Sequence, residues 1–370
     1  MSLRLVAAVL LTGALSLTGK PVRAQVLADS EAYVGIEIRS LRFERLAGVQ
    51  RLSQTVVPIG AVIPLGRFTL DVGSSWVHSF LVRADGSSHS VDAFTDSQVR
   101  GSYVFGHDAV VATVLLNLPT GLDKASAKDY TVIGAISPSL FGFPVAAYSS
   151  GFSVTSGLAA AVPAGGWSIG VAGSIRMSRA FTPYADALGP ITYKPGVEGR
   201  IRGALDGLVG SSRLAVGFTY STFGDDHFGK TAAARGQYRP GPRWLGEATL
   251  VSPVGSSTLT MAVWNFRRTN GDTTGVSARN RENLAAGEIS LSIPVSSSLT
   301  IEPGISGRAA TPETGRGHLA GAGTGLRFQP GQAVSLLLVG RYDTGWIEDN
   351  AAKRSDVHGF YFSGLFRVSF

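Results

Sequence analysis

FYFSGLFRVSF, residues 360–370, ends the chain. Phe, Gly or Val stands at every even position of this stretch, whereas Tyr, Ser, Leu and Arg stand at the odd positions. Because the side chains of a β-strand point alternately to its two faces, this period of two predicts a strand with one apolar face and one more polar face. Whether the apolar face meets a protein core or a lipid bilayer depends on the rest of the chain.

The same alternation recurs far from the C-terminus. In WSIGVAGSIRM, residues 167–177, the large apolar residues share one face and Ser, Gly, Ala and Arg share the other. Residues 197–205, 213–222 and 299–308 alternate in the same way. Strands of this kind build either a soluble sandwich or a membrane barrel, so periodicity alone predicts only an all-β protein.

Composition narrows the choice. Gly is abundant at 47 of 370 residues, charged residues make up only 16%, mean hydropathy is +0.18, and there is no cysteine for disulfides. The longest uncharged stretch, 131–175, contains Pro138, Pro144 and Pro163. Since a helix that crosses a bilayer needs about 20 mostly apolar residues in a row, helical spans are not expected.

Turn length also alternates along the chain. Short turns are expected at residues 64–66, 105–108, 163–166, 208–211, 253–256, 294–298 and 329–332. Longer polar loops are expected at residues 46–53, 80–97, 119–150, 179–195, 223–242, 269–282, 309–317 and 344–357. The regular alternation predicts a transmembrane antiparallel β-barrel of about 16 strands, with short periplasmic turns and long outer loops. Because residues 231–238 (TAAARGQY) also read as strand, the count is expected to lie between 14 and 18.

The N-terminus has the pattern of an export signal. Arg4 precedes an apolar run that extends from Leu5 to Gly19, and small residues follow near Ala24. We expect residues 1–24 to be a cleaved signal peptide and residues 25–370 to be one barrel domain. Removing Arg4, Lys20 and Arg23 lowers the formal charge from +7 to +4, which is too small a bias to predict a nucleic-acid partner.

The polar faces of the strands would line the lumen of such a barrel. A wetted lumen needs charged residues, and their arrangement would polarise a permeating solute. The residues expected there are Arg67, Arg100, Arg176, Glu198, Arg200, Arg202, Arg213, Glu288, Glu302, Arg308 and Arg341, and the surplus of arginine predicts a preference for anions. The alternative is that these side chains form ion pairs that only stiffen the wall.

The longest loop, 119–150, begins with polar residues and then turns apolar, in VIGAISPSLFGFPVAAYSSG. An exposed apolar loop is avoided in water unless it packs against something. It resembles the third loop of general porins, which folds inward and narrows the channel. The resemblance implies a constriction near Phe141, Phe143 and Tyr148, and the alternative is that the loop covers the barrel mouth or contacts a second subunit.

Two further stretches resemble known families. The final strand, with Phe366, Val368 and the terminal Phe370, resembles the closing strand of Gram-negative outer-membrane proteins. In those proteins this strand is the signal that the barrel-assembly machinery reads. Residues 97–121, SQVRGSYVFGHDAVVATVLLNLPTG, resemble the outer-membrane transporters of phenol-degradation pathways, a family related in general style to the hydrophobic-compound transporters. These resemblances imply localisation in the outer membrane, in contact with its lipid and lipopolysaccharide.

Enzymatic and nucleotide-binding alternatives rest on one loop. GDDHFGKT, residues 224–231, fits the spacing of a phosphate-binding loop, but Asp225 and Asp226 would place negative charge where phosphates bind. His227 beside them allows an Asp–His pair such as rim hydrolases use. The six histidines lack metal-ligand spacing, so we expect no cofactor, no metal and no enzymatic activity.

Together these features predict an outer-membrane channel for the passive uptake of small amphipathic, aromatic or anionic solutes. A structural or adhesive barrel is the first alternative, and a barrel hydrolase is the second. A homo-oligomer is left open, because no residue pattern addresses it.

Overall fold

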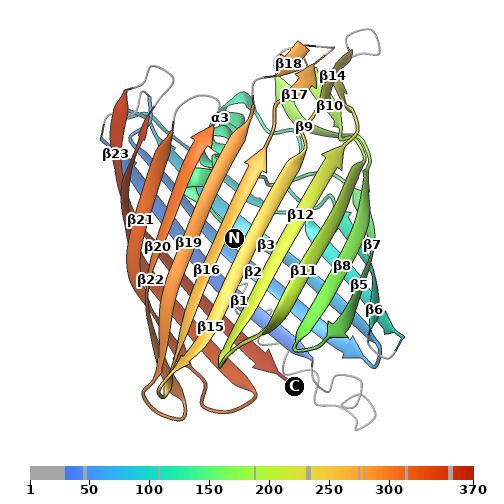
Figure 1. Ribbon diagram of the computed structural model, residues 1–370. Coiled ribbons are helices and arrows are strands. Elements are labelled where there is room, and N and C mark those ends of the chain that lie inside the picture. The colour runs from blue at the N-terminus through green and yellow to red at the C-terminus, as the bar shows by residue number, and fades with distance from the viewer. Residues whose placement is uncertain are drawn as a thin grey trace, which may run out of the picture.

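The chain forms a tall, closed barrel in the computed structural model (Figure 1). The structure describes residues 30–44, 48–106, 109–186, 189–230, 235–273, 276–278, 280–312, 316–348 and 353–370. The expected signal peptide, residues 1–24, lies outside the described residues and stays a prediction.

The wall is built from long antiparallel strands. Their bounds are β1 Glu31–Phe43, β2 Arg51–Leu65, β3 Phe68–Val82, β4 Ser88–Phe94, β5 Ser97–Phe105, β6 Val110–Leu118, β7 Ser153–Ala164, β8 Trp167–Ser178, β11 Glu198–Val209, β12 Ser212–Phe223, β15 Arg243–Val254, β16 Ser257–Arg268, β19 Glu282–Pro294, β20 Leu299–Pro312, β21 Gly317–Phe328, β22 Val334–Glu348 and β23 Arg354–Ser369. Each strand pairs with its neighbours along the chain.

The sheet closes on itself because β1 pairs with β23 over its full length, from Glu31 opposite Ser369 to Phe43 opposite Val357. Within the described residues the sheet has 17 segments, but β4 and β5 both pair with β3 and are two pieces of one wall strand. The wall therefore has sixteen strands. The prediction of an all-β, antiparallel, sixteen-stranded barrel is confirmed.

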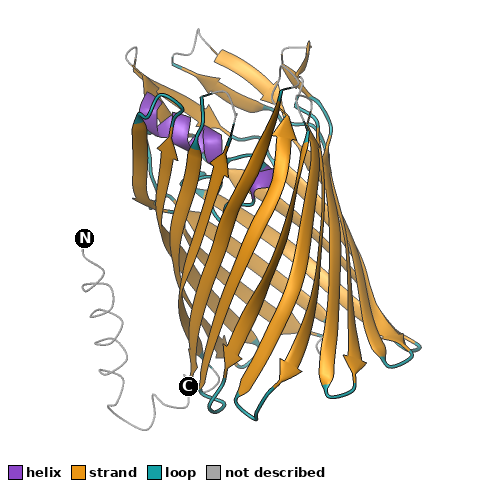
Figure 2. Ribbon diagram, turned by 90° about the vertical axis from the view of Figure 1, so that its left-hand side faces the viewer, coloured by secondary structure: helices purple, strands orange, loops and turns teal. Residues whose placement is uncertain are grey.

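Tight turns join the strands at the end of the barrel that holds the C-terminus (Figure 2). They fall where the sequence predicts them, between β2 and β3, β7 and β8, β11 and β12, and onward around the wall. Gly66, Gly165, Gly210 and Gly255 each have φ between 61° and 64° at the first turn residue. A two-residue hairpin of type II′ requires a positive φ at that position, and glycine adopts it without steric cost.

The opposite end differs from the sequence prediction at several loops. The expected loop 80–97 is wrong, because β3 continues to Val82 and β4 begins at Ser88. Three other expected loops contain hairpins that form a separate six-stranded sheet above the rim. Its strands are β9 Phe181–Asp186, β10 Gly189–Lys194, β13 Asp226–Gly229, β14 Arg235–Arg239, β17 Gly271–Thr273 and β18 Val276–Ala278.

The outward face of the wall is apolar. Leu158, Ile175, Ile201, Phe218 and Ile305 are all more than half exposed, and other large apolar side chains surround them. Soluble proteins avoid such a continuous apolar surface, whereas a barrel in a bilayer requires one.

The described residues also form two short helices, α3 Ala127–Ile136 and the 3₁₀ helix η1 Ser139–Phe141. No helix among the described residues is long and apolar enough to cross a membrane.

We predict that the folded barrel resists dissociation in detergent, so that boiled and unboiled samples migrate differently on a gel. Deleting Phe370 is expected to reduce the folded, heat-shifted fraction in the outer membrane, because its backbone N–H donates to Ser30 O at 2.9 Å beside the closing pair. Phe370→Tyr keeps this bond and serves as the control. Equal assembly of the deletion variant and wild type would contradict the prediction.

Candidate functional site

The segment between β6 and β7 lies inside the outer half of the barrel, as the helices in Figure 2 show. It leaves the wall at the Leu118-Pro119-Thr120-Gly121 corner. There the Ser97 N–H donates to Thr120 Oγ1 at 2.8 Å and the Gly121 N–H donates to Asp96 Oδ1 at 3.0 Å. A Cβ on Gly121 would overlap the carbonyl oxygen of Tyr148, so only glycine fits at this position. The corner therefore directs the chain inward.

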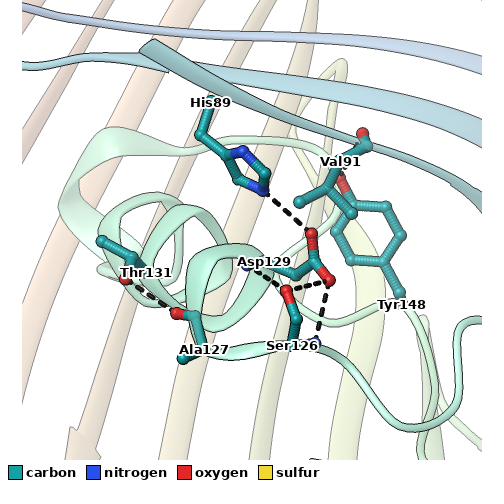
Figure 3. Close-up of polar contacts among 7 residues, drawn as sticks. All are labelled: His89, Val91, Ser126, Ala127, Asp129, Thr131 and Tyr148. Carbon is teal, nitrogen blue, oxygen red and sulfur yellow. Dashed lines mark hydrogen bonds and ion pairs between the residues drawn. The ribbon is translucent and has the colours of Figure 1, made fainter. Parts of the chain in front are cut away.

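Helix α3 begins with a capping box (Figure 3). The Asp129 carboxylate accepts from the N–H of Ser126 at 2.9 Å and from its hydroxyl at 2.7 Å, and lies 3.0 Å from His89 Nε2 on β4. Burial raises the pKa of Asp129, but the hydrogen bonds from Ser126 and His89 outweigh it and hold the pKa below its usual value. The same carboxylate thus caps the helix and fastens it to the wall.

The apolar half of the segment packs against β1, β2 and β3. Phe141 is 7% exposed and meets Phe43 edge to face, with ring centroids 5.3 Å apart. Phe143 is equally buried and packs on Phe141. This apolar cluster also contains Val132 and Ile136 of α3. Aromatic side chains supply most of the apolar area that holds the segment in place.

Polar anchors fix its register on the wall. Gln54 of β2 donates to Val145 O at 2.8 Å and accepts from the Val145 N–H at 2.9 Å. The Tyr148 hydroxyl donates to Ser79 Oγ at 2.6 Å, and burial raises the pKa of Tyr148 to about 12. Gln54 and Ser79 are fully buried at the level where the segment crosses them. Sequence analysis missed both residues, because nothing in a strand pattern says which inward polar side chain meets a loop.

Asp96 is a second anchor that sequence analysis missed. It lies in the break between β4 and β5, and its Oδ2 accepts from Asn117 Nδ2 at 2.8 Å and from the Ser150 N–H at 2.7 Å. Together with the bond from Gly121, it ties both ends of the inward segment to one point of the wall. The sequence signal that could have identified this anchor is an acidic residue at the point where a strand is interrupted.

These contacts place the three aromatic residues of the expected constriction at the interface between segment and wall. Tyr148 is only 2% exposed, so this residue and the two phenylalanines hold the segment rather than face open space. The surface turned to the lumen comes from Pro144, Ala146 and Ala147, which border a cavity of about 440 Å³. A polar cavity of about 190 Å³ adjoins it, between Gln98 and the wall at β7, β8 and β11.

Most charges expected in the lumen point inward in ion pairs. The pairs are Arg100 with Asp71 at 2.6 Å, Arg200 with Glu198 at 2.7 Å, Arg213 with Asp206 at 3.0 Å, Arg327 with Glu302 at 3.0 Å, Arg341 with Asp343 at 2.9 Å, and Arg202 with Glu247. Arg176 instead donates to Ser153 and Ser150. For these residues the geometry agrees with the alternative stated above, in which the side chains form ion pairs within the wall.

Three expected lumen residues differ from this pattern. Arg67 lies in the turn between β2 and β3 and not on the wall, so its placement on a strand is wrong. Glu288 and Arg308 have neither an ion pair nor a hydrogen bond with the described residues. A Cβ on Gly142, which has φ 59°, would overlap the guanidinium of Arg308. The absent side chain at Gly142 lets the inward segment approach Arg308 directly.

Arg308 belongs to a larger basic group. Arg39 and Asp343 are 1% and 4% exposed and lie 2.9 Å apart, and Arg341 contacts the same carboxylate. Buried charges are costly unless paired, and here one carboxylate faces three guanidinium groups. Glu288 lies near Arg308, and Glu37 accepts a hydrogen bond from the Tyr361 hydroxyl at 3.1 Å. Arg39 was missed, because its carboxylate partner comes from the distant strand β22.

One tryptophan points into the barrel. Trp264 pairs opposite Glu247 and packs against the inner apolar cluster.

The last residue of the phosphate-loop spacing at 224–231, Thr231, lies outside the described residues, and the described part, 224–230, does not have the geometry of a phosphate-binding loop. Asp226 accepts from the Tyr193 hydroxyl at 2.5 Å and from the Gly196 N–H at 2.6 Å, and Asp225 pairs with Arg239. Burial and the neighbouring Asp226 raise the pKa of Tyr193. Residues 226–229 form strand β13 rather than a helix. No group of His, Asp and Glu suited to a metal occurs among the described residues.

The sequence matches no protein-family model and no curated protein. Similar solved structures include a FadL homologue of Pseudomonas aeruginosa, with 9% identity, TM-score 0.46 and coverage of 96% of this chain and 94% of that chain. The toluene transporter TodX of P. putida has 10% identity, TM-score 0.44 and the same coverage. The outer-membrane channel DcaP of Acinetobacter baumannii has 8% identity, TM-score 0.42 and coverage of 92% and 96%. With TM-scores below 0.5, these similarities carry no weight for the function of this chain.

The closed sixteen-stranded wall, its apolar outer face and its charged inner face define the class of protein: a β-barrel of the outer-membrane type. Inside that class, this chain is a barrel whose lumen is narrowed on one side by a segment fixed to β1–β4.

We predict that Gln54→Ala combined with Tyr148→Phe loosens the inward segment. Each change removes buried hydrogen bonds, at a cost of roughly 1–3 kcal/mol per unsatisfied group. Single-channel recordings in planar bilayers should then show larger and noisier conductance. Thr222→Ala with Tyr220→Phe, which alters outward side chains of β12 only, is the matched control. Identical traces for wild type and the anchor variant would contradict a narrowing role.

For the segment 224–231 we predict that Lys230→Met leaves heat-shifted folding intact and that wild-type protein shows no saturable ATP binding by calorimetry. Residues 226–229 form strand β13, and the carboxylates of Asp225 and Asp226 already accept hydrogen bonds from Arg239 and Tyr193. Micromolar ATP affinity that disappears in Lys230→Met would contradict the geometry.

Proposed function

We propose that this chain is a passive channel of the Gram-negative outer membrane that conducts small amphipathic, aromatic or anionic solutes. The observation that carries the proposal is Arg308, which forms no ion pair with the described residues and lies at the point where the inward segment meets the wall. The proposal includes export by the signal peptide at 1–24 and insertion by the barrel-assembly machinery, with Phe366, Val368 and Phe370 as the recognised residues.

The outward face supports membrane placement. Most wall strands have 12 to 16 residues, whereas about 9–11 tilted residues cross a bilayer. The strands are therefore long enough to span the hydrocarbon and extend beyond it. Closure leaves no unpaired strand edge in the lipid, which the bilayer demands of any spanning sheet.

The inner face supports permeation by charged solutes. Ion pairs neutralise much of the charge on the inner wall. These pairs line a polar passage and lie on β3, β11, β12, β15 and β20–β22. Against this background Arg308 offers guanidinium N–H groups to a solute oxygen. Guanidinium groups bind carboxylates in a planar, two-pronged geometry.

The solute must also pass the apolar surface of the inward segment. Pro144, Ala146 and Ala147 present small apolar groups to the lumen next to polar cavity walls. A small molecule with an apolar body and one anionic group matches both surfaces. This combination favours amphipathic anions, such as aromatic monocarboxylates, over sugars of similar size.

The proposal is tested by reversal potentials in planar bilayers under a salt gradient. Arg308→Glu is expected to shift the anion-to-cation permeability ratio towards cations by about fivefold or more, the effect of ~1 kcal/mol between charges in water. Arg316→Glu at the outer rim, where the arginine pairs with Glu348 outside the lumen, is the control.

Solute class is tested by swelling of liposomes that contain the protein. Benzoate should enter faster than glucose and faster than uncharged benzyl alcohol. The rate for benzyl alcohol is corrected by subtracting its leak through protein-free liposomes. Wild-type protein without any conductance or swelling would overturn the channel proposal and leave a structural barrel.

A further inference from the structure

A row of basic side chains crosses the outward face near the loop end of the barrel. His358 of β23 stands opposite Arg42 of β1, and Arg42 stands opposite Arg51 of β2. All three point away from the lumen, because their neighbours Leu41, Leu52 and Val357 are buried inside. The strand pairing thus places three basic groups side by side, about 5 Å from one strand to the next.

The two arginines of this row lack acidic partners. Neither Arg42 nor Arg51 forms an ion pair with the described residues, and Arg51 Nε is buried without a hydrogen bond. The Arg51 guanidinium lies over the ring of Phe80, 5.6 Å from its centroid. Like charges directly opposite each other destabilise a sheet. An anion bound between the two arginines would reduce the repulsion between their charges.

Nearby acids do not neutralise the row. Asp356 of β23 is paired with Arg354 at 3.3 Å. Glu44 follows Arg42 on the same face and borders a cavity of about 900 Å³ that also touches Arg42, Arg51 and His358. With one carboxylate against two arginines, the row keeps a net positive charge.

A slot lies directly below the row, towards the middle of the wall. Ser40, Ser53 and Thr55 form its floor, and Phe360 and Tyr342 form one side. The slot has a volume of about 500 Å³ and opens outward, and Arg42, Arg51 and His358 border it at the rim. Small floor residues beside one aromatic side leave room for a hydrocarbon chain, and the arginines stand where the polar head of that chain would lie.

We propose that this row and slot form a binding site for lipopolysaccharide, with a phosphate of its lipid anchor on Arg42 and Arg51 and an acyl chain in the slot. Guanidinium groups are the preferred partners of phosphate oxygens. The row lies at the loop end of the barrel, which faces the outer leaflet, and the phosphorylated glycolipid of that leaflet is lipopolysaccharide. The inference rests on the outer-membrane placement of the proposed function, but not on conduction.

The test uses native mass spectrometry of the detergent-refolded full-length barrel, titrated with purified lipopolysaccharide in buffer that contains EDTA. Wild type should retain one tightly bound molecule. Arg42→Gln with Arg51→Gln should lower the affinity at least about tenfold, because two charge-assisted contacts are lost. Arg267→Gln, which removes an outward arginine near the outer end of β16, should bind as wild type does.

A second variant keeps both arginines. Ser53→Phe fills the slot, so it should weaken lipopolysaccharide binding while leaving the heat shift of the barrel unchanged. Phosphatidylglycerol and lipopolysaccharide stripped of its phosphates should bind no more tightly to wild type than to the arginine variant.

Several outcomes would overturn the site: unchanged affinity in the arginine variant, an equal loss in Arg267→Gln, full binding to Ser53→Phe, or equal retention of phosphatidylglycerol. The arginine variant should conduct normally in bilayers, since the row faces outward. Normal conductance without lipopolysaccharide binding therefore rejects this site alone, whereas binding without conductance rejects the channel alone.

Discussion

The pairing of β1 with β23 is the interaction on which the rest of the structure depends. Thirteen successive positions, from Glu31 to Phe43, pair with the final strand. Without this pairing, two strand edges would expose unpaired N–H and C=O groups on an apolar surface. Closure also fixes which side chains share the lumen, since it brings Arg39 of β1 beside Asp343 of β22. The buried charge cluster is thus a consequence of closure.

The inward segment uses the enclosed space that closure creates. Apolar contacts of Phe141 and Phe143 supply area, while Gln54, Ser79 and Asp96 fix position through hydrogen bonds. Apolar packing is tolerant of small displacements, whereas a hydrogen bond is not, so the two together define one placement. Gly121 and Gly142 matter because they allow close approach at the two points where the segment turns and crosses the lumen.

Charge is distributed differently on the two faces. Inside, most guanidinium groups have carboxylate partners, and Arg308 is an exception at the edge of the inward segment. Outside, large apolar side chains cover much of the wall, and polar and charged groups include Arg42 and Arg51, which stand together near the outer rim. Arginines without an ion pair to the described residues include Arg308 on the inner face and the neighbouring Arg42 and Arg51 on the outer face, the two positions for which we propose an anionic ligand. Both are positions where an anion from outside the chain would complete the pairing.

The sequence by itself determined the wall: the period of two in stretches such as 167–177 and 360–370, and glycine at hairpin positions such as Gly66, are local signals that need no knowledge of neighbours. It also placed most charged residues on the inward face. Only the tertiary structure decided that Trp264 points inward, that the hairpins above the rim join in a second sheet, and that Gln54 and Asp96 hold the inward segment. These features depend on which distant strands meet once the sheet closes, and a contact between distant segments leaves no periodic trace in either one.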